Sequence, residues 1–194
     1  MIMRWMTAVL FATIAAGADY TLSPAPNSKF QLEVHKTGLM SGKVHVFTFE
    51  RYTGTLSYTA SQPEKAQVSF TVENNSIVCR DTWVDEKDKV KIVKVAHESM
   101  GTEKHPQLSF RSEKVVGRED GTFDVTGPLT IKGLAKPVTI RVSVRTEGNG
   151  LRLQGRATIL RKDYGINPKA AVPFGLIGNK EEMPVQFDLL ATPR

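Results

Sequence analysis

Apolar and polar residues alternate with a period of two over most of the chain. A strand that has one face on a core places an apolar residue at every second position. Phe30, Leu32 and Val34 follow this pattern, and a turn around residues 38–42 joins their strand to the next as a hairpin. The alternation predicts eight strands, at residues 30–35, 44–58, 66–73, 107–111, 123–131, 138–145, 151–159 and 185–189.

Residues 86–100 break this alternation. Val90, Val93, Ala96 and Met100 recur near helical spacing among charged residues, which predicts one short amphipathic helix between strands 3 and 4. Pro106 then starts the fourth strand, because the residue before a proline is pushed out of the helical region of backbone space. Two further prolines mark residues 162–182 as a long loop.

Eight antiparallel strands with one apolar face each must hide those faces. Closing them into a barrel does so and also removes exposed strand edges. We therefore predict an all-β fold, an eight-stranded antiparallel barrel, with two packed open sheets as the alternative architecture. The lumen of such a barrel is either filled by side chains or left open for one small ligand, and the sequence leaves both possibilities open.

The first residues differ from the rest of the chain. Arg4 precedes an apolar run over residues 6–16, and Ala16, Gly17 and Ala18 form a small-residue cleavage pattern. A membrane anchor would need roughly 20 apolar residues, about twice this run. We predict that residues 1–18 are a signal peptide and that residues 19–194 form one mature domain, which is periplasmic or secreted.

Composition and charge narrow the class of protein. The chain has 194 residues, of which 40% are hydrophobic and 24% charged, as expected for one soluble globular domain. The net charge of +6 favours an anionic partner such as a phospholipid head group. Its basic residues do not alternate with aromatic ones as in a groove that binds single strands, so no nucleic acid is expected. A single cysteine, Cys79, excludes an intrachain disulfide.

The sequence carries little sign of catalytic chemistry. It has no nucleophile elbow, zincin helix or phosphate-binding loop. His35 and His45 approach each other across the predicted hairpin, but surface histidines are the favoured interpretation over a zinc site. Asp81 and other acidic residues are interpreted as solvated charges. No enzyme activity, metal or cofactor is therefore expected.

Several ordered motifs do point to a known family. The stretch Thr126–Val138, with the sequence TGPLTIKGLAKPV, resembles the most recognisable segment of the YceI-like family, and residues 30–35, 105–112 and 161–166 add weaker matches. The resemblance covers residues 19–192. It implies an extended, lipocalin-like barrel with an apolar tunnel that holds an isoprenoid chain or a fatty amphiphile, without catalytic residues. The chain departs from the family pattern at 87–101 and 170–179, two segments that would reshape the tunnel mouth.

The predicted function is an exported binding protein for one long apolar amphiphile, such as a polyisoprenoid, a quinone or a fatty acid or amide. The alternatives are a stress-response or protein-interaction module with a filled barrel, and a redox accessory acting on quinones. The sequence leaves open whether the protein forms a homodimer. Three cationic residues, Arg80, Arg161 and Lys162, are candidates for contact with a head group because they lie at strand ends or in loops, and solvated surface charges are the alternative interpretation. The predicted wall residues of the tunnel are Phe30, Leu32, Val34, Phe70, Leu108, Phe110, Val125, Ile140, Val142, Leu153 and Phe187.

Overall fold

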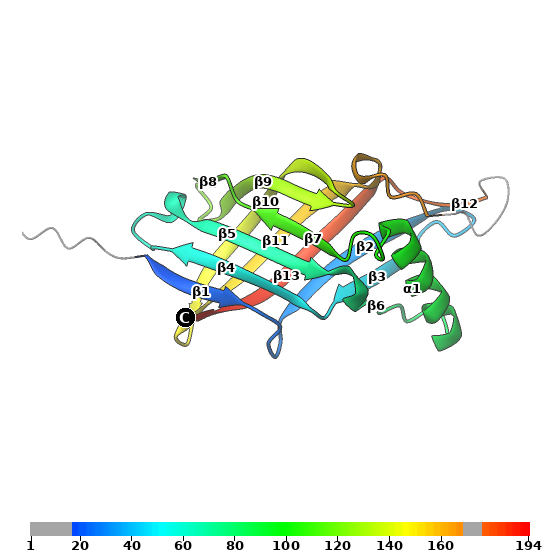
Figure 1. The fold of residues 1–194 in the computed structure, drawn as a ribbon, viewed down its shortest axis with the longest axis horizontal. Coiled ribbons are helices and arrows are strands. Elements are labelled where there is room, and N and C mark those ends of the chain that lie inside the picture. Colours follow the sequence, from blue (N-terminus) through cyan, green and yellow to red (C-terminus); the bar gives the residue numbers. More distant parts are fainter. Residues whose placement is uncertain (1–16, 169–175) are drawn as a thin grey trace, which may run out of the picture.

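A closed ring of eight antiparallel strands forms the body of the protein in the computed structural model, which describes residues 17–168 and 176–194. β1 pairs with both β4 and β13, and this double pairing closes the ring. The strands cross the long axis obliquely (Figure 1). In spatial order the ring comprises β1 (Ala18–Leu22), β4 (Tyr52–Tyr58), β5 (Gln67–Glu73), β7 (Gln107–Arg111), β9 (Phe123–Ile131), β10 (Leu134–Glu147), β11 (Gly150–Leu160) and β13 (Glu182–Pro193).

Five further strands lie outside this ring. The last residues of β13 pair with β1, whereas its first half pairs with β2 (Lys29–Gly38). On its other side β2 pairs with β3 (Val44–Phe49), and β3 pairs in turn with β6 (Ile77–Cys79). Two short strands, β12 (Ile177–Asn179) and β8 (Lys114–Gly117), pair with β2 and β9 respectively. Three short 3-10 helices connect strands: η1 (Pro63–Lys65), η2 (Asn74–Ser76) and η3 (Arg161–Tyr164). The fold is therefore a barrel whose wall is extended at one end.

The predicted barrel is confirmed, but the strands that form it differ in part from those predicted. The predicted strand 44–58 is two strands, because the chain turns at Glu50 and Arg51 from the β2–β3–β6 sheet into the ring. Ser76 stabilises this turn: its backbone oxygen accepts from Glu50 N at 3.2 Å and its hydroxyl accepts from Arg51 N at 3.0 Å. The pairing of β2 with β3 gives the expected hairpin.

The prediction that the helix lies between strands 3 and 4 was wrong. The helix α1 (Glu86–Met100) has the predicted bounds but follows β6, because β1, β6 and the division of 44–58 add strands before it. Asp85 caps its first turn by accepting from Asp88 N at 2.8 Å, and Gly101 ends it in the left-handed conformation. Among the residues described, no helix is long and apolar enough to cross a membrane.

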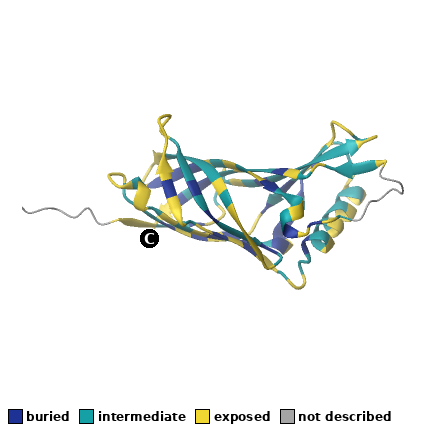
Figure 2. Cartoon of the chain, turned by 90° about the horizontal axis from the view of Figure 1, so that it is seen from above, coloured by how far each residue is buried: buried dark blue, intermediate teal, exposed yellow. Residues whose placement is uncertain are grey.

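The face that α1 turns to the barrel also differs in part. Ile92, Val93 and Ala96 pack against the core and Met100 is buried in it, whereas Val90 is 70% exposed. Figure 2 shows exposed residues along the outer side of this helix and buried ones on the strands. α1 thus covers one end of the barrel, which we call the helix end; β8 lies at the opposite end (Figure 1).

The motif at 126–138 forms the β9–β10 hairpin. Lys132 and Gly133 make its two-residue turn, both with positive φ (52° and 74°), as a tight hairpin of this hand requires. The Lys132 ammonium group donates to Ser99 O at 3.0 Å and to Gly165 O at 2.7 Å. The hairpin tip therefore ties the last turn of α1 to the segment that follows η3.

A buried ion pair joins two neighbouring strands on the outside of the barrel. Arg152 of β11 is 6% exposed, and its guanidinium donates to the Asp188 carboxylate and to Asn27 O. Burial acts to raise the pKa of Asp188, but hydrogen bonds from Arg152 and Gln154 outweigh it and lower the pKa below the ordinary 3.8. A carboxyl group with a depressed folded-state pKa stabilises the fold above its unfolded pKa, and this contribution disappears as the pH falls through the folded pKa.

Replacing Asp188 by asparagine should therefore destabilise the protein in a pH-dependent way. At pH 7 we expect a loss of about 1–3 kcal/mol in the free energy of unfolding, because a buried guanidinium loses its charged partner. The difference from the wild type should shrink below about pH 4, where the unfolded carboxyl group becomes protonated. Urea unfolding at pH 7 and pH 3 measures both values. Equal differences at the two pH values would contradict the assigned role of Asp188.

Candidate functional site

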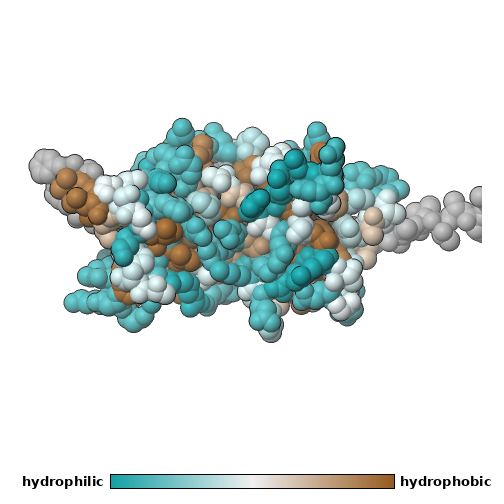
Figure 3. Space-filling view, turned by 180° about the vertical axis from the view of Figure 1, so that it is seen from behind, coloured by the Kyte–Doolittle hydropathy of each residue, from teal (hydrophilic) through white to brown (hydrophobic). Residues whose placement is uncertain are grey.

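A cavity of about 780 Å³ runs through the inside of the barrel. It extends from Val115 and Phe123 near β8 to Met40 and Trp83 at the helix end. Its wall is mostly apolar, whereas the outer surface seen from behind is mostly hydrophilic, with apolar residues in small groups (Figure 3). A cavity of this size and lining is typical of sites that enclose one small molecule, which span roughly 300–1,000 Å³.

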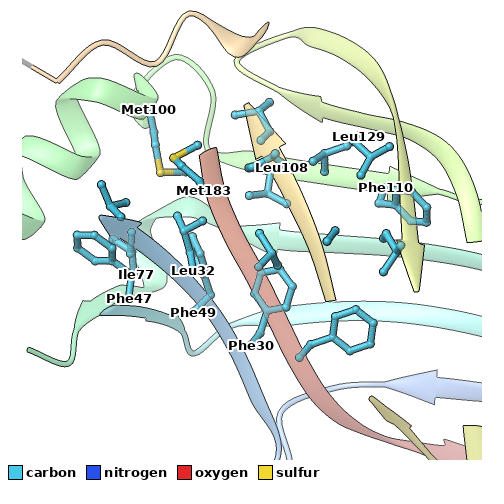
Figure 4. Close-up of a pocket in the computed structure, with 18 of the residues that line it drawn as sticks. Phe30, Leu32, Phe47, Phe49, Ile77, Met100, Leu108, Phe110, Leu129 and Met183 are labelled. Carbon is cyan, nitrogen blue, oxygen red and sulfur yellow. The ribbon is translucent and has the colours of Figure 1, made fainter. Parts of the chain in front are cut away.

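All eleven wall residues predicted from the alternation line this cavity. Their inward direction follows from strand register, because residues paired across two strands share a face. Phe30 pairs with Phe187, Phe70 with Phe110, and Ile140 with Val125. The close-up shows side chains from opposite sides of the barrel converging on this space (Figure 4).

Aromatic side chains fill part of the lumen. The Phe30 ring lies 5.6 Å from that of Phe49 and 5.5 Å from that of Phe70, and the Tyr52 ring lies 5.4 Å from that of Phe70, all between centroids. These rings come from β2, β3, β4 and β5 and gather inside the barrel. The lumen is thus partly packed and partly open.

Sequence reasoning missed the lining at the helix end. Ile92, Val95, Ala96 and Ser99 of α1 line the cavity at helical spacings of three and four residues, a signal present in the sequence. Met100 and Met183 point toward each other over the cavity (Figure 4). Methionine suits such a position because its flexible thioether adapts to irregular space. Of the predicted mouth segment 170–179, residues 170–175 lie outside the described residues.

The three cationic residues predicted near a head group are placed differently. Arg161 lines the cavity, but its guanidinium donates to Glu181 and, at 3.1 Å, to Ile166 O. Arg80 does not line it; its side chain donates to Glu50 and to the Thr48 hydroxyl. Lys162 is exposed and also lies outside the lining. This placement gives Arg80 and Lys162 no contact with the cavity.

A second polar feature of the cavity wall is the pair of His45 and Asp81. The Asp81 side chain is fully buried; its carboxylate accepts from Val46 N at 2.7 Å and lies 2.6 Å from His45 Nδ1. His45 lines the cavity and its ring stacks on that of Trp83, with centroids 5.1 Å apart. The interpretation of Asp81 as a solvated charge and of His45 as a surface residue was therefore wrong.

The other candidate groups do not form a reactive site. His35 and His45 point to opposite faces, since His45 pairs with Val34 and His35 with Val44. Within residues 17–168 and 176–194, no three His, Cys, Asp or Glu side chains are grouped so that they could hold a metal ion. Cys79 is buried, and burial raises the pKa of its thiol, which makes it a weak nucleophile.

Comparisons with known proteins agree with this architecture. UPF0312 proteins are among the relatives: that of Pseudomonas savastanoi pv. phaseolicola is 29% identical over 170 residues, covering 82% of each chain, and that of Ectopseudomonas mendocina is 34% identical over 125 residues, covering 61% of this chain and 62% of the relative. These names assign no enzymatic activity.

Two solved structures share the fold. BcnA from Burkholderia cenocepacia superposes with a TM-score of 0.70 at 21% identity, covering 86% of this chain and 98% of BcnA. A YCEI protein from Campylobacter jejuni gives a TM-score of 0.53 at 13% identity, covering 76% of this chain and 84% of that protein. The model of the YceI-like domain matches residues 20–191, which include nearly all of the barrel and the whole of α1. The chain therefore belongs to the YceI-like family.

Proposed function

We propose that this protein is an exported, non-enzymatic binding protein that encloses one long apolar amphiphile, such as a polyisoprenoid, a quinone or a fatty acid or amide, inside its barrel. The apolar cavity of about 780 Å³ carries this proposal. A largely apolar space of that size inside the barrel favours a hydrocarbon chain over a polar metabolite. The same open volume argues against a module whose barrel is merely filled.

Burial of a long tail would supply enough free energy for tight binding. Each methylene group that moves from water into an apolar site contributes about 0.8 kcal/mol. A tail of ten buried carbons would contribute about 8 kcal/mol before the costs of ordering the ligand are subtracted. Binding would therefore depend mainly on tail length and on the shape of the wall.

Export is part of the same proposal. The predicted signal peptide lies mostly outside the described residues, but its predicted end falls at the start of β1, where Ala18 is the first residue. A mature chain starting at Asp19 would keep the pairs of Tyr20 and Leu22 with β4 and β13. Cleavage at this point is thus compatible with a closed barrel.

Native mass spectrometry of the protein, expressed with its signal peptide and purified from the exported fraction without detergent, tests the proposal. We expect a polypeptide that starts at Asp19 and carries a mass excess that lipid extraction removes. A mass equal to that of the bare polypeptide, together with no uptake of added long-chain amphiphiles, would instead favour the filled-barrel module. An exported protein that retains Met1 would contradict the predicted cleavage.

A further inference from the structure

We propose that His45 is the polar anchor of the cavity and that it selects amphiphiles whose polar end is a hydroxyl group, as in a long-chain alcohol or a phenol. The inference rests on the proposed function, since it concerns the ligand of the same cavity. It starts from one observation: a histidine that is oriented by a buried carboxylate lines a cavity whose wall is mostly apolar.

Asp81 holds the histidine ring in place. Its carboxylate is fixed by Val46 N, and the backbone N–H of Arg80 donates to Val46 O at 2.7 Å, so the Asp81 side chain extends the β3–β6 ladder by one more bond. The 2.6 Å contact with His45 Nδ1 then sets the orientation of the imidazole. Both oxygens of the buried carboxylate are used in this way.

Aromatic contacts fix the same ring from the side. Trp83 stacks on His45 with an interplanar angle of 28°, and the Trp83 indole N–H donates to Val44 O at 2.9 Å. The Lys43 ammonium lies 5.4 Å from the Trp83 ring on which His45 stacks. The imidazole is therefore held rigidly, as a residue that selects a ligand must be.

The hydrogen bond to Asp81 also determines what the second ring nitrogen can do. An ionised carboxylate only accepts hydrogen bonds, so Nδ1 carries the proton. In the neutral ring Nε2 is then an acceptor, and no described residue donates to it. A ligand group that donates, such as a hydroxyl, satisfies Nε2, whereas an ether or an alkyl end leaves it unpaired.

Lys91 and Lys36 also line this cavity but are placed less rigidly. Lys91 forms an ion pair with Asp88 of the same helix, with a distance of 2.8 Å. Lys36 also lines the cavity, and burial lowers the pKa of its ammonium group, which disfavours the charged form. Among these groups, His45 alone is oriented by a fully buried partner.

A matched pair of ligands tests the inference. Cetyl alcohol and cetyl methyl ether have the same tail, and in the ether a methyl group replaces the hydroxyl hydrogen and so removes the donor. Their affinities are measured at pH 8.5 by displacement of a fluorescent long-chain probe. The wild type should prefer the alcohol by roughly tenfold, because the ether leaves Nε2 unpaired. His45→Phe should lose this preference, and His45→Gln, which retains an acceptor oxygen, should keep part of it.

Asp81→Asn separates selection from a merely structural role. The asparagine amide would donate to Nδ1, so the proton moves to Nε2 and the ring becomes a donor. The ether should then bind more tightly than to the wild type, and the preference should fall toward one. If Asp81 were only structural, both ligands would weaken together. Nitrogen-15 NMR of the His45 ring reports which nitrogen carries the proton in each variant.

Further outcomes keep the two proposals apart. His35→Phe, on the other face of the β2–β3 hairpin, serves as the matched control and should keep the tenfold preference. If the wild type binds the alcohol and the ether equally, or if its Nε2 is protonated at pH 8.5, the inference about His45 is overturned while the proposed function stands. If neither ligand displaces the probe and the purified protein carries no lipid, the proposed function fails with it.

Discussion

Replacing Phe110 by aspartate should lower the free energy of unfolding by about 3–5 kcal/mol or prevent folding, because it removes a buried ring and places an unpaired charge in an apolar space. Phe110 is 7% exposed, pairs with Phe70 and Leu129 on the neighbouring strands, and packs with Val115 and Val125 at the end of the barrel near β8. Chemical denaturation of the purified variant measures the loss.

The control for this prediction lies next to it on the same strand. Ser109 is exposed on the outer face of β7, so Ser109→Asp introduces the same charge into water and should change stability by no more than about 0.5 kcal/mol. If Phe110→Asp folds, it should also lose the lipid that the wild type retains during detergent-free purification. Unchanged melting together with unchanged lipid content would place the side chain of residue 110 outside the wall.

The part of the site that lies on regular strands could be predicted from the sequence. Along Val138–Val144 of β10 and Leu151–Ile159 of β11 every second residue is apolar or glycine, and a strand whose register is fixed on both sides must turn that face inward. For this reason Ile140, Val142 and Leu153 line the cavity as expected. Their placement needs only local alternation and closure of the ring.

The rest of the fold depends on contacts between distant segments. The backbone N–H groups of the turn at Glu50 and Arg51 donate to Ser76, which lies 25 residues from Arg51. No local sequence pattern predicts this turn. Closure through β1 was likewise missed, because a five-residue strand next to the predicted signal peptide carries too little alternation. Local alternation therefore gave the number of strands in the ring but not their identity.

The polar part of the site could not be predicted from the sequence, for a related reason. Asp81 and Val46 are separated by 35 residues, and the carboxylate becomes buried only because β6 pairs with β3. A single acidic residue after a short strand is most often solvated, so composition favours the wrong interpretation. The anchor inferred for the ligand is thus a product of topology, whereas the apolar wall follows from sequence pattern.

Replacing Ala157 by tryptophan should block the cavity without unfolding the barrel. Ala157 lines the cavity on β11 opposite Val185, and an indole at this position would extend into the open volume. If the ring excludes four methylene groups of a long tail, at about 0.8 kcal/mol each, the affinity for that tail should fall by roughly 100-fold or more. Displacement of a fluorescent long-chain probe measures the change.

The neighbouring residue provides the matched control, and tail length provides the diagnostic signature. Thr158 is exposed on the outer face of the same strand, so Thr158→Trp adds the same side chain to the surface and should leave the affinity unchanged. In the Ala157→Trp protein, short alkyl chains that end before the obstruction should bind as they do to the wild type. Each carbon beyond the obstruction should add nothing to the affinity. A loss that is the same for short and long tails would indicate a general distortion of the barrel, and no loss at all would mean that the tail does not pass residue 157.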